Sequence, residues 1–230
     1  DLGNHRVKIT YSSKASEVQN GMCFQSRPTV RDHAGTFFWK SKDITMTSLD
    51  IHFLHGFGMV GQHSENITMD DVDFEAPKES GRTTAGYADF VQMSGCKGTI
   101  NISNCTFAGP HDDPINIHGT FNTVTAISSD RRTITVQYNH NETAGFPNFF
   151  EGDEIEFMTK GNMITVEDSV RTVTKVDGPD GMGGNMGDGS GSLTTIKLTL
   201  NEAVPSDVQV NQHVVENITY TPTVNITNCE

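Results

Sequence analysis

The stretch KGTINISNCTFAGPHDDPINIHG, residues 97–119, decides the fold. Its first half alternates apolar and polar residues with the period of two that is typical of a half-buried β-strand. Two earlier stretches carry the same pattern, KDITMTSLDIHFLHGFGMVGQ at residues 42–62 and ENITMDDVDFEAP at residues 65–77. The chain therefore contains an internal repeat whose units are built from strands.

The repeat has a step of 23 to 24 residues once an insertion of about nine residues near 77–86 is allowed. The first apolar column is then Ile44, Ile67 and Ile100. The further columns are Met46, Met69 and Ile102; Leu49, Val72 and Cys105; Ile51, Phe74 and Phe107; and Met59, Val91 and Ile115. Strands at this step predict an all-β parallel β-helix, with turns stacked at about 4.8 Å. A leucine-rich repeat is the alternative, but its LxxLxLxxN spacing is absent.

The repeat ends after Thr120, which predicts a division of the chain into β-helix turns over residues 1–120, an insertion over 121–214 and a return to a turn over 215–230. Seven strand-like segments separated by turn residues predict a small antiparallel β-barrel in the insertion. They are 123–127, 133–138, 153–158, 163–170, 171–176, 193–200 and 207–210. The return is indicated by NITNC near the end, which resembles NISNC at 101–105. Because the end of a β-helix is an open sheet edge, we expect a further segment of the same protein, or a second copy, to cover it.

Composition restricts the class of partner. A net charge of −13 over 230 residues argues against nucleic acid and anionic membranes, whereas a neutral, hydroxyl-rich ligand such as a sugar is compatible with it. The four cysteines show no spacing typical of a zinc site, and Cys105 and Cys229 fall at apolar repeat positions. No apolar run is long enough to span a membrane.

The repeat also brings carboxylates together. Asp89 lies two residues before Val91, and Asp113 lies two residues before Ile115, so the column places Asp89 beside Asp113, with Asp112 next to them. Clustered carboxylates repel each other unless protons, cations or a ligand resolve the repulsion, and their pKa values then separate. A polar turn with Asp at its tip is the structural alternative for Asp112 and Asp113.

The same alignment predicts a polar ledge along one side of the repeat. Its members are Arg31, Asp32, His33, His55, Tyr87, Asp89, His111, Asp112 and Asp113. Two carboxyl groups, one acid and one base or nucleophile, are what glycoside hydrolysis requires. A calcium-assisted polysaccharide lyase or epimerase, and a carbohydrate-binding solenoid without turnover, are the alternatives that these residue types leave open. A serine nucleophile is disfavoured because no GxSxG motif occurs.

Four segments carry a family resemblance: RDHAGTFFW at 31–39, SLDIHFLHGFGMVGQHSENIT at 48–68, YADFVQMSGCKG at 87–98 and GPHDDPINIHGT at 109–120. Together they resemble glycoside hydrolase family 110, bacterial exo-acting α-1,3-galactosidases that remove the terminal galactose of the blood group B antigen. The resemblance implies a right-handed parallel β-helix with β-barrel insertions, a secreted, periplasmic or cell-surface location, and inverting hydrolysis without a metal or other cofactor.

The resemblance also implies site residues. The acidic triad of the family corresponds to Asp89, Asp112 and Asp113. The residues expected to contact the sugar are Arg31, Asp32, His33, His55, Tyr87, His111, Asn116 and His118. Inverting enzymes separate acid and base by about 6.5–9.5 Å, more than neighbours in a stacked column, so a diagonal pair of Asp89 and Asp112 is one arrangement. The roles of the three acids stay unassigned at this point.

Overall fold

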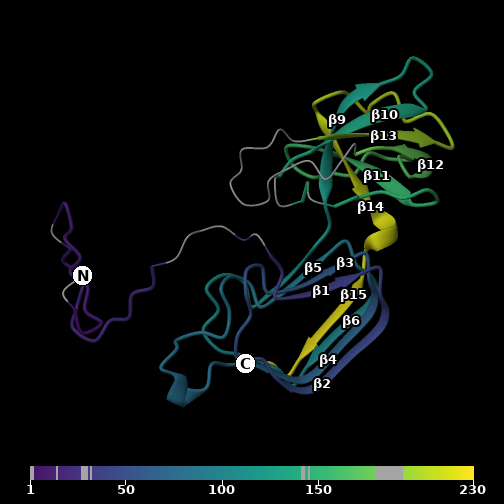
Figure 1. Cartoon of the computed structure of the whole chain (residues 1–230). Helices are drawn as coiled ribbons and strands as arrows, with labels where there is room; N and C mark the ends of the chain where they lie inside the picture. The colour runs from purple at the N-terminus through teal and green to yellow at the C-terminus, as the bar shows by residue number, and fades with distance from the viewer. Residues whose placement is uncertain are drawn as a thin grey trace.

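The structure is a computed structural model that describes residues 3–13, 15–26, 31, 33–140, 143–144, 146–179 and 194–230. These residues form an all-β protein with two parallel sheets and a closed barrel. Two short 3₁₀ turns, η1 (Lys78–Ser80) and η2 (Ile218–Tyr220), are the helical elements of the described ranges. No helix among these residues is long and apolar enough to cross a membrane. Figure 1 shows the barrel above the two sheets.

The two parallel sheets share the repeat, because the chain passes from one sheet to the other and back. The first sheet has the order β1-β3-β5-β8 and the second has the order β15-β6-β4-β2. The first contains β1 (Thr36–Trp39), β3 (Met59–Gln62), β5 (Val91–Ser94) and β8 (Ile115–His118). The second contains β2 (Lys42–Asp50), β4 (Glu65–Phe74), β6 (Lys97–Ser103) and β15 (Thr223–Thr227), and β7 (Thr106–Phe107) pairs with β4.

The register confirms the alignment of the repeat. Ile67 pairs with Ile44 on one side and with Ile100 on the other. In the first sheet, Val91 pairs with Met59 and with Ile115, so the inserted residues around η1 leave the column intact. The apolar columns recur because each strand turns every second side chain toward the space between the sheets.

The core between the two sheets is made of these columns. Ile67, Met69 and Ile100 are completely buried. The ring of Phe74 stacks on Phe90, with centroids 5.3 Å apart, and on Phe107, at 5.2 Å. Burial of one such side chain stabilises a fold by about 1.5–3 kcal/mol, so the columns are a main source of stability for the parallel sheets.

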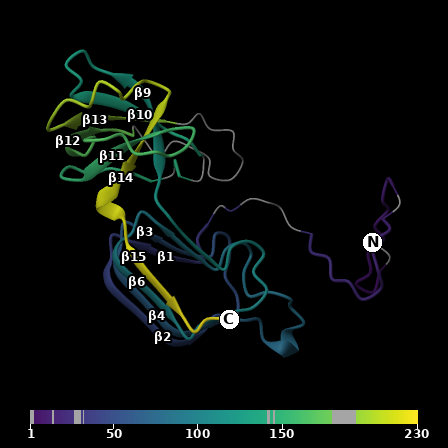
Figure 2. The same ribbon diagram turned by 180° about the vertical axis from the view of Figure 1, so that it is seen from behind.

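The barrel is antiparallel and closes in the order β10-β13-β12-β11-β14-β9. Its core includes Phe157 and Tyr138, and the buried Tyr138 hydroxyl donates a hydrogen bond to the carbonyl oxygen of Phe146 at 2.7 Å. The chain enters through β9 and leaves through β14, which pair with each other (Figure 2). The six strands are β9 (Phe121–Ile127), β10 (Thr133–Tyr138), β11 (Glu154–Thr159), β12 (Arg171–Asp177), β13 (Thr195–Leu200) and β14 (His213–Asn217).

Two of the seven strand predictions in the barrel are wrong. Residues 163–170 form a loop in which Asp168 has a positive φ of 51°, and a single bridge from Thr165 to Met158 is its β-pairing. Residues 207–210 form a turn that inserts the buried Val208 into the barrel core. In both segments the apolar residues alternate as in a strand. The six strands already close the barrel, however, so no strand edge of the described barrel is left for either segment to pair with.

An aromatic cluster joins the barrel to the parallel sheets, and we call it the junction cluster: Trp39, His63, Phe146, Phe150 and Tyr220. The His63 ring makes edge contacts with the other four rings, at centroid distances of 4.6–5.7 Å. Its Nε2 lies 2.7 Å from the carbonyl oxygen of Pro147 in the barrel. Burial, with a smaller effect of the Lys40 charge, lowers the pKa of His63 to about 4.

Candidate active site

The predicted acids lie on the turns that lead into β5 and β8. The turn before β5 carries Asp89, and the turn before β8 carries Asp112 and Asp113. The backbones of the two turns are joined, because the Phe90 amide donates to the carbonyl oxygen of Asp113 at 3.0 Å. On the other side, Gly58 has a φ of +81° and a Cβ there would lie 2.1 Å from the carbonyl oxygen of Asp89. Only glycine permits this close approach of the turns.

Asp89 is the buried acid of the site, with a side chain that is 2% exposed. Burial raises the pKa of its carboxyl group, and the charges of Asp112 and Asp113 add to the rise. The Asn116 amide, which donates to Asp89 Oδ2 at 3.3 Å, and the Arg31 charge act in the opposite direction. Asp89 is thus held in surroundings that favour its protonated form.

Arg31 connects Asp89 with Asp112. Its Nη1 lies 3.5 Å from Asp89 Oδ1, and its Nη2 forms an ion pair with Asp112 Oδ2. The Asp112 side chain is 40% exposed, so this carboxylate is far better solvated than Asp89. The guanidinium also lies over the Phe57 ring, 5.5 Å from its centroid. One cation therefore holds a buried and a solvated carboxyl group on either side of itself.

We call the turns before β5 and β8, which carry Asp89, Asp112 and Asp113, the acid turns. Two further predicted residues, Asp113 and His111, lie on the turn before β8. Asp113 is exposed and lies near enough to raise the pKa of Asp89. His111 is half-buried, and its Nδ1 has no hydrogen-bond partner among the described residues. Asp32 lies outside the described residues.

Asn116 and His118 lie on β8, directly after the acids. Asn116 contacts Asp89 as described above, whereas His118 bonds at Nδ1 to the carbonyl oxygen of Gly119 at 2.8 Å. His118 Nε2 also lies 3.4 Å from the amide nitrogen of Gln92 on the neighbouring strand. These contacts link Asn116 to the acids, whereas those of His118 are with Gly119 and Gln92.

His33, His55 and Tyr87 form a row of rings on the same ledge, which we call the aromatic strip. The centroids of His33 and His55 are 6.1 Å apart with an interplanar angle of 23°. Those of His55 and Tyr87 are 6.3 Å apart at 57°. His33 and His55 are exposed and Tyr87 is half-buried.

Sequence reasoning missed Phe57 and Gln92. Phe57 occupies the column of Asp89 and Asp113 one turn earlier, which was visible in the alignment, but its role under the Arg31 guanidinium was not. Gln92 pairs with Asn116 in the register of β5 and β8. The repeat alignment, followed from Asn116 to the preceding turn, could therefore have identified it.

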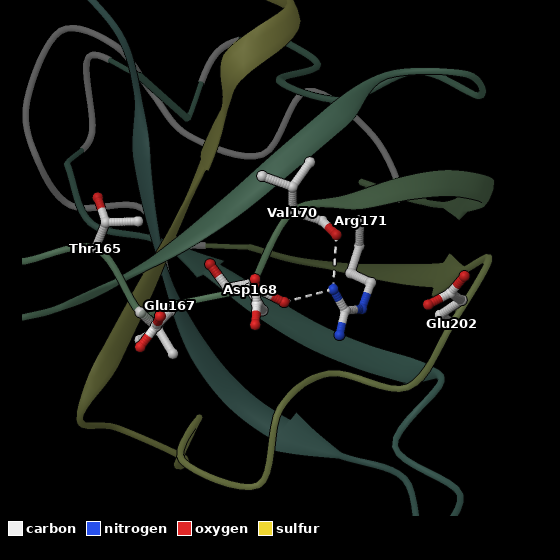
Figure 3. Close-up of a pocket in the computed structure, with 8 residues that line it drawn as sticks. Thr165, Glu167, Asp168, Val170, Arg171 and Glu202 are labelled. Atoms are coloured by element: carbon white, nitrogen blue, oxygen red, sulfur yellow. Dashed lines mark hydrogen bonds between the residues drawn. The ribbon is translucent and has the colours of Figure 1, made fainter.

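A hollow lies on the barrel, in the loop before β12 (Figure 3). It has a volume of about 570 Å³, and its lining includes Glu167, Asp168, Arg171 and Glu202. Arg171 is held there by backbone oxygens, since its Nη1 donates to the carbonyls of Asp168 at 2.8 Å and Val170 at 2.7 Å. Across the described part of the chain, no three His, Cys, Asp or Glu side chains are grouped so that they could hold a metal ion.

The chain is similar to a known protein family and to several named proteins. Residues 133–179 match the family described as GLAA-B beta-barrel domain II. Over 97% of its length the chain is 47% identical to alpha-1,3-galactosidase A of Streptomyces avermitilis and covers 35% of that protein. It is 39% identical to alpha-1,3-galactosidase A of Bacteroides thetaiotaomicron over 97% of the chain, and 31% identical to that of Akkermansia muciniphila over 99%.

The chain spans about a third of the length of these relatives, at 35–37% of each. The similarity nevertheless covers both the parallel sheets with the acids and the barrel, because nearly the whole chain aligns. The chain belongs to the family of the alpha-1,3-galactosidases A, glycoside hydrolase family 110, as its sequence predicted.

Proposed function

We propose that the residues of the acid turns hydrolyse the glycosidic bond of a terminal α-1,3-linked galactose and so release this sugar from an oligosaccharide or glycan. Water adds to the anomeric carbon of galactose while the bond from that carbon to the leaving oxygen breaks, and the leaving oxygen takes up a proton. The observation that carries the proposal is the pairing of buried Asp89 with solvated Asp112 through Arg31. The names of the relatives, alpha-1,3-galactosidase A, support the substrate class.

Asp89 is assigned as the general acid. An acid must hold its proton at the working pH, and burial raises the pKa of Asp89 in that direction. The hydrogen bond from Asn116 orients the carboxyl group, because it fixes Oδ2 and leaves Oδ1 on the side of Arg31.

Asp112 or Asp113 serves as the general base that removes a proton from the attacking water. Both are exposed, so either can contact a water molecule at the anomeric carbon. We propose inversion in a single displacement, for which acid and base stand far enough apart to admit water. The guanidinium of Arg31 between Asp89 and Asp112 supports such a separation.

The scaffold completes the proposal. We interpret the two parallel sheets as the faces of a right-handed parallel β-helix over residues 1–120, with the barrel of 121–214 inserted and 215–230 returning to a turn. Parallel strands joined by crossovers are right-handed in about 98% of cases. The relatives are bacterial, and a glycan substrate fits a secreted, periplasmic or cell-surface protein.

Galactose release followed by proton NMR tests the proposal. With an α-1,3-galactosyl oligosaccharide such as a blood group B oligosaccharide, we expect β-galactose as the first product, at the same rate with and without EDTA. Asp89→Asn is expected to lower kcat at least a hundredfold while the circular dichroism spectrum is kept. The same loss is expected of Asp112→Asn or of Asp113→Asn, whichever variant removes the base. Release of α-galactose would exclude inversion, and loss of activity with EDTA or an unsaturated product would favour a metal-assisted lyase instead.

A further inference from the structure

The aromatic strip differs from the aromatic stack in the core. Phe74, Phe90 and Phe107 also stack along the repeat, but their rings lie between the sheets, and Phe74 and Phe90 are fully buried. His33 and His55 stack at the surface, where little apolar area is removed from water. The stack in the core stabilises the fold, whereas His33 and His55 in the strip are exposed to solvent.

The strip extends away from the acids in a defined direction. His33, His55 and Tyr87 lie on the turns before β1, β3 and β5, whereas the acids lie on the turns before β5 and β8. Because the sheet order is β1-β3-β5-β8, the strip runs two turns beyond Asp89 on the side opposite to Asp112. At about 4.8 Å per turn it covers roughly 10 Å.

The proposed roles of the acids divide the substrate along this direction. The base removes a proton from the water that attacks the galactose carbon, so this water approaches from the β8 side, where Asp112 and Asp113 lie. The acid protonates the leaving oxygen, so the leaving sugar begins at Asp89, on the turn that also carries Tyr87. The sugars beyond the broken bond would then lie along the turns that carry His55 and His33.

We propose that the aromatic strip binds the leaving oligosaccharide, with the sugar next to galactose over Tyr87 and the following one over His55 and His33. This inference rests on the proposed function. Pyranose rings present a face of C–H groups, and aromatic rings with a polar edge accommodate both this face and the hydroxyls around it. The strip thereby selects substrates by what is attached to galactose, while the acid turns bind galactose itself.

The test compares two substrates that share galactose and differ in the leaving group, namely galactosyl-α-1,3-lactose and α-galactosyl fluoride. Fluoride has no ring to stack, so kcat/KM for the fluoride reports on the galactose site alone. In His55→Ala we expect KM for the trisaccharide to rise roughly tenfold, with kcat/KM for the fluoride within about twofold of the wild type. His55→Phe keeps a flat ring and is expected to restore KM for the trisaccharide. His52→Ala, a change of an exposed histidine that bonds to the Glu75 carbonyl, is the matched control and is expected to change neither.

An equal loss on both substrates in His55→Ala would overturn the inference, because the ring would then serve the galactose site or the fold. An unchanged KM for the trisaccharide would overturn it as well. Lactose, the leaving disaccharide, provides a readout that is independent of hydrolysis. We expect it to shift the Hε1 resonances of His33 and His55 in NMR spectra of the wild type, and the absence of a shift speaks against the strip as a binding site. If the wild type hydrolyses neither galactoside, the proposed function is wrong, and the lactose titration alone then decides the inference.

Discussion

At the scale of the residue, Asp89 shows how opposing effects combine at one carboxyl group. Burial and two neighbouring carboxylates raise its pKa, whereas the Asn116 hydrogen bond and the Arg31 charge lower it. An acid without these two partners would hold its proton more firmly and transfer it less readily, since efficient proton transfer requires a pKa near the working pH. Asn116 and Arg31 therefore limit the rise in the pKa of Asp89 that burial and the neighbouring carboxylates cause.

Asn116→Ala is expected to raise the pKa of Asp89 further, because it removes a hydrogen bond that favours the ionised carboxylate. A general acid is active while protonated, so activity falls as the pH rises through its pKa, and the alkaline limb of kcat/KM should move to higher pH. A single hydrogen bond predicts a shift of up to about one pH unit. A pH profile of galactose release measures it.

Asn101→Ala is the matched control, since this asparagine accepts a hydrogen bond from Asn225 at 2.9 Å on the second sheet, away from the acid turns. It should leave the alkaline limb in place. A shift of the limb to lower pH in Asn116→Ala would contradict the assignment of Asp89 as the acid.

The sequence predicted part of this site because the repeat is regular where the acids lie. The columns that end in Val91 and Ile115 carry Asp89 and Asp113 with them, and the structure keeps that register. Arg31 precedes the first strand, so no column determines which carboxylates it reaches. The burial of Asp89 depends on the close approach of Gly58, which is a property of packing and not of the repeat period.

At the scale of the element, alternation predicts strands well only where a partner strand is available. The column of Ile67 succeeds because β2, β4 and β6 stack in one register. Residues 207–210 alternate equally well, yet Val208 fills the barrel core from a turn. Local pattern identifies a buried side chain in both cases, whereas the closure of the barrel decides which segment becomes a strand.

The turn between β3 and β4 carries His63 and gives the junction cluster a dependence on pH. The folded pKa of His63, about 4, lies below its ordinary value of 6.5, so the unfolded chain binds the proton more strongly between these values. Stability therefore rises with pH from about 4 to about 6.5 and falls as the pH drops through the same window, by up to about 3 kcal/mol.

We expect the free energy of unfolding, measured by urea denaturation at pH 4.5 and pH 7, to show this slope in the wild type. His63→Phe keeps a ring in the cluster but cannot be protonated, so its difference between the two pH values should be smaller by about 2 kcal/mol or more. Buried carboxyls such as Asp89 and Asp153, whose pKa values are raised, act in the opposite direction and are present in both proteins. Equal slopes in the two proteins would show that His63 is protonated without cost in the folded state.

At the scale of the whole molecule, the chain has two separate cores, one between the parallel sheets and one inside the barrel. The junction cluster and the strands β9 and β14 connect them. A change in one core should therefore affect that part first.

Phe157→Ala, in the barrel core, is expected to cost about 3–5 kcal/mol because it leaves a cavity at a fully buried position. Hydrogen exchange should then speed up at amides of β9 to β14, while β3 to β6 keep most of their protection. The reciprocal change Phe90→Ala in the other core is the comparison, with the opposite distribution expected. Equal acceleration throughout the chain in both variants would show that the two cores unfold as one unit.

The pairing of β15 with β6 has a consequence for the order of folding. Asn225 bonds to Asn101 across a sequence separation of 124 residues, so in an unfolded chain this contact closes a long loop. Once the barrel has formed, its first and last strands lie side by side, and the flexible path between β6 and β15 shrinks to the short segments that flank it. Since the entropy of loop closure grows with the logarithm of length, this shortening favours the contact by on the order of 1 kcal/mol. The folded barrel thus holds the two ends of this loop close together. A chain that folds its barrel late should therefore pair β15 with β6 late as well.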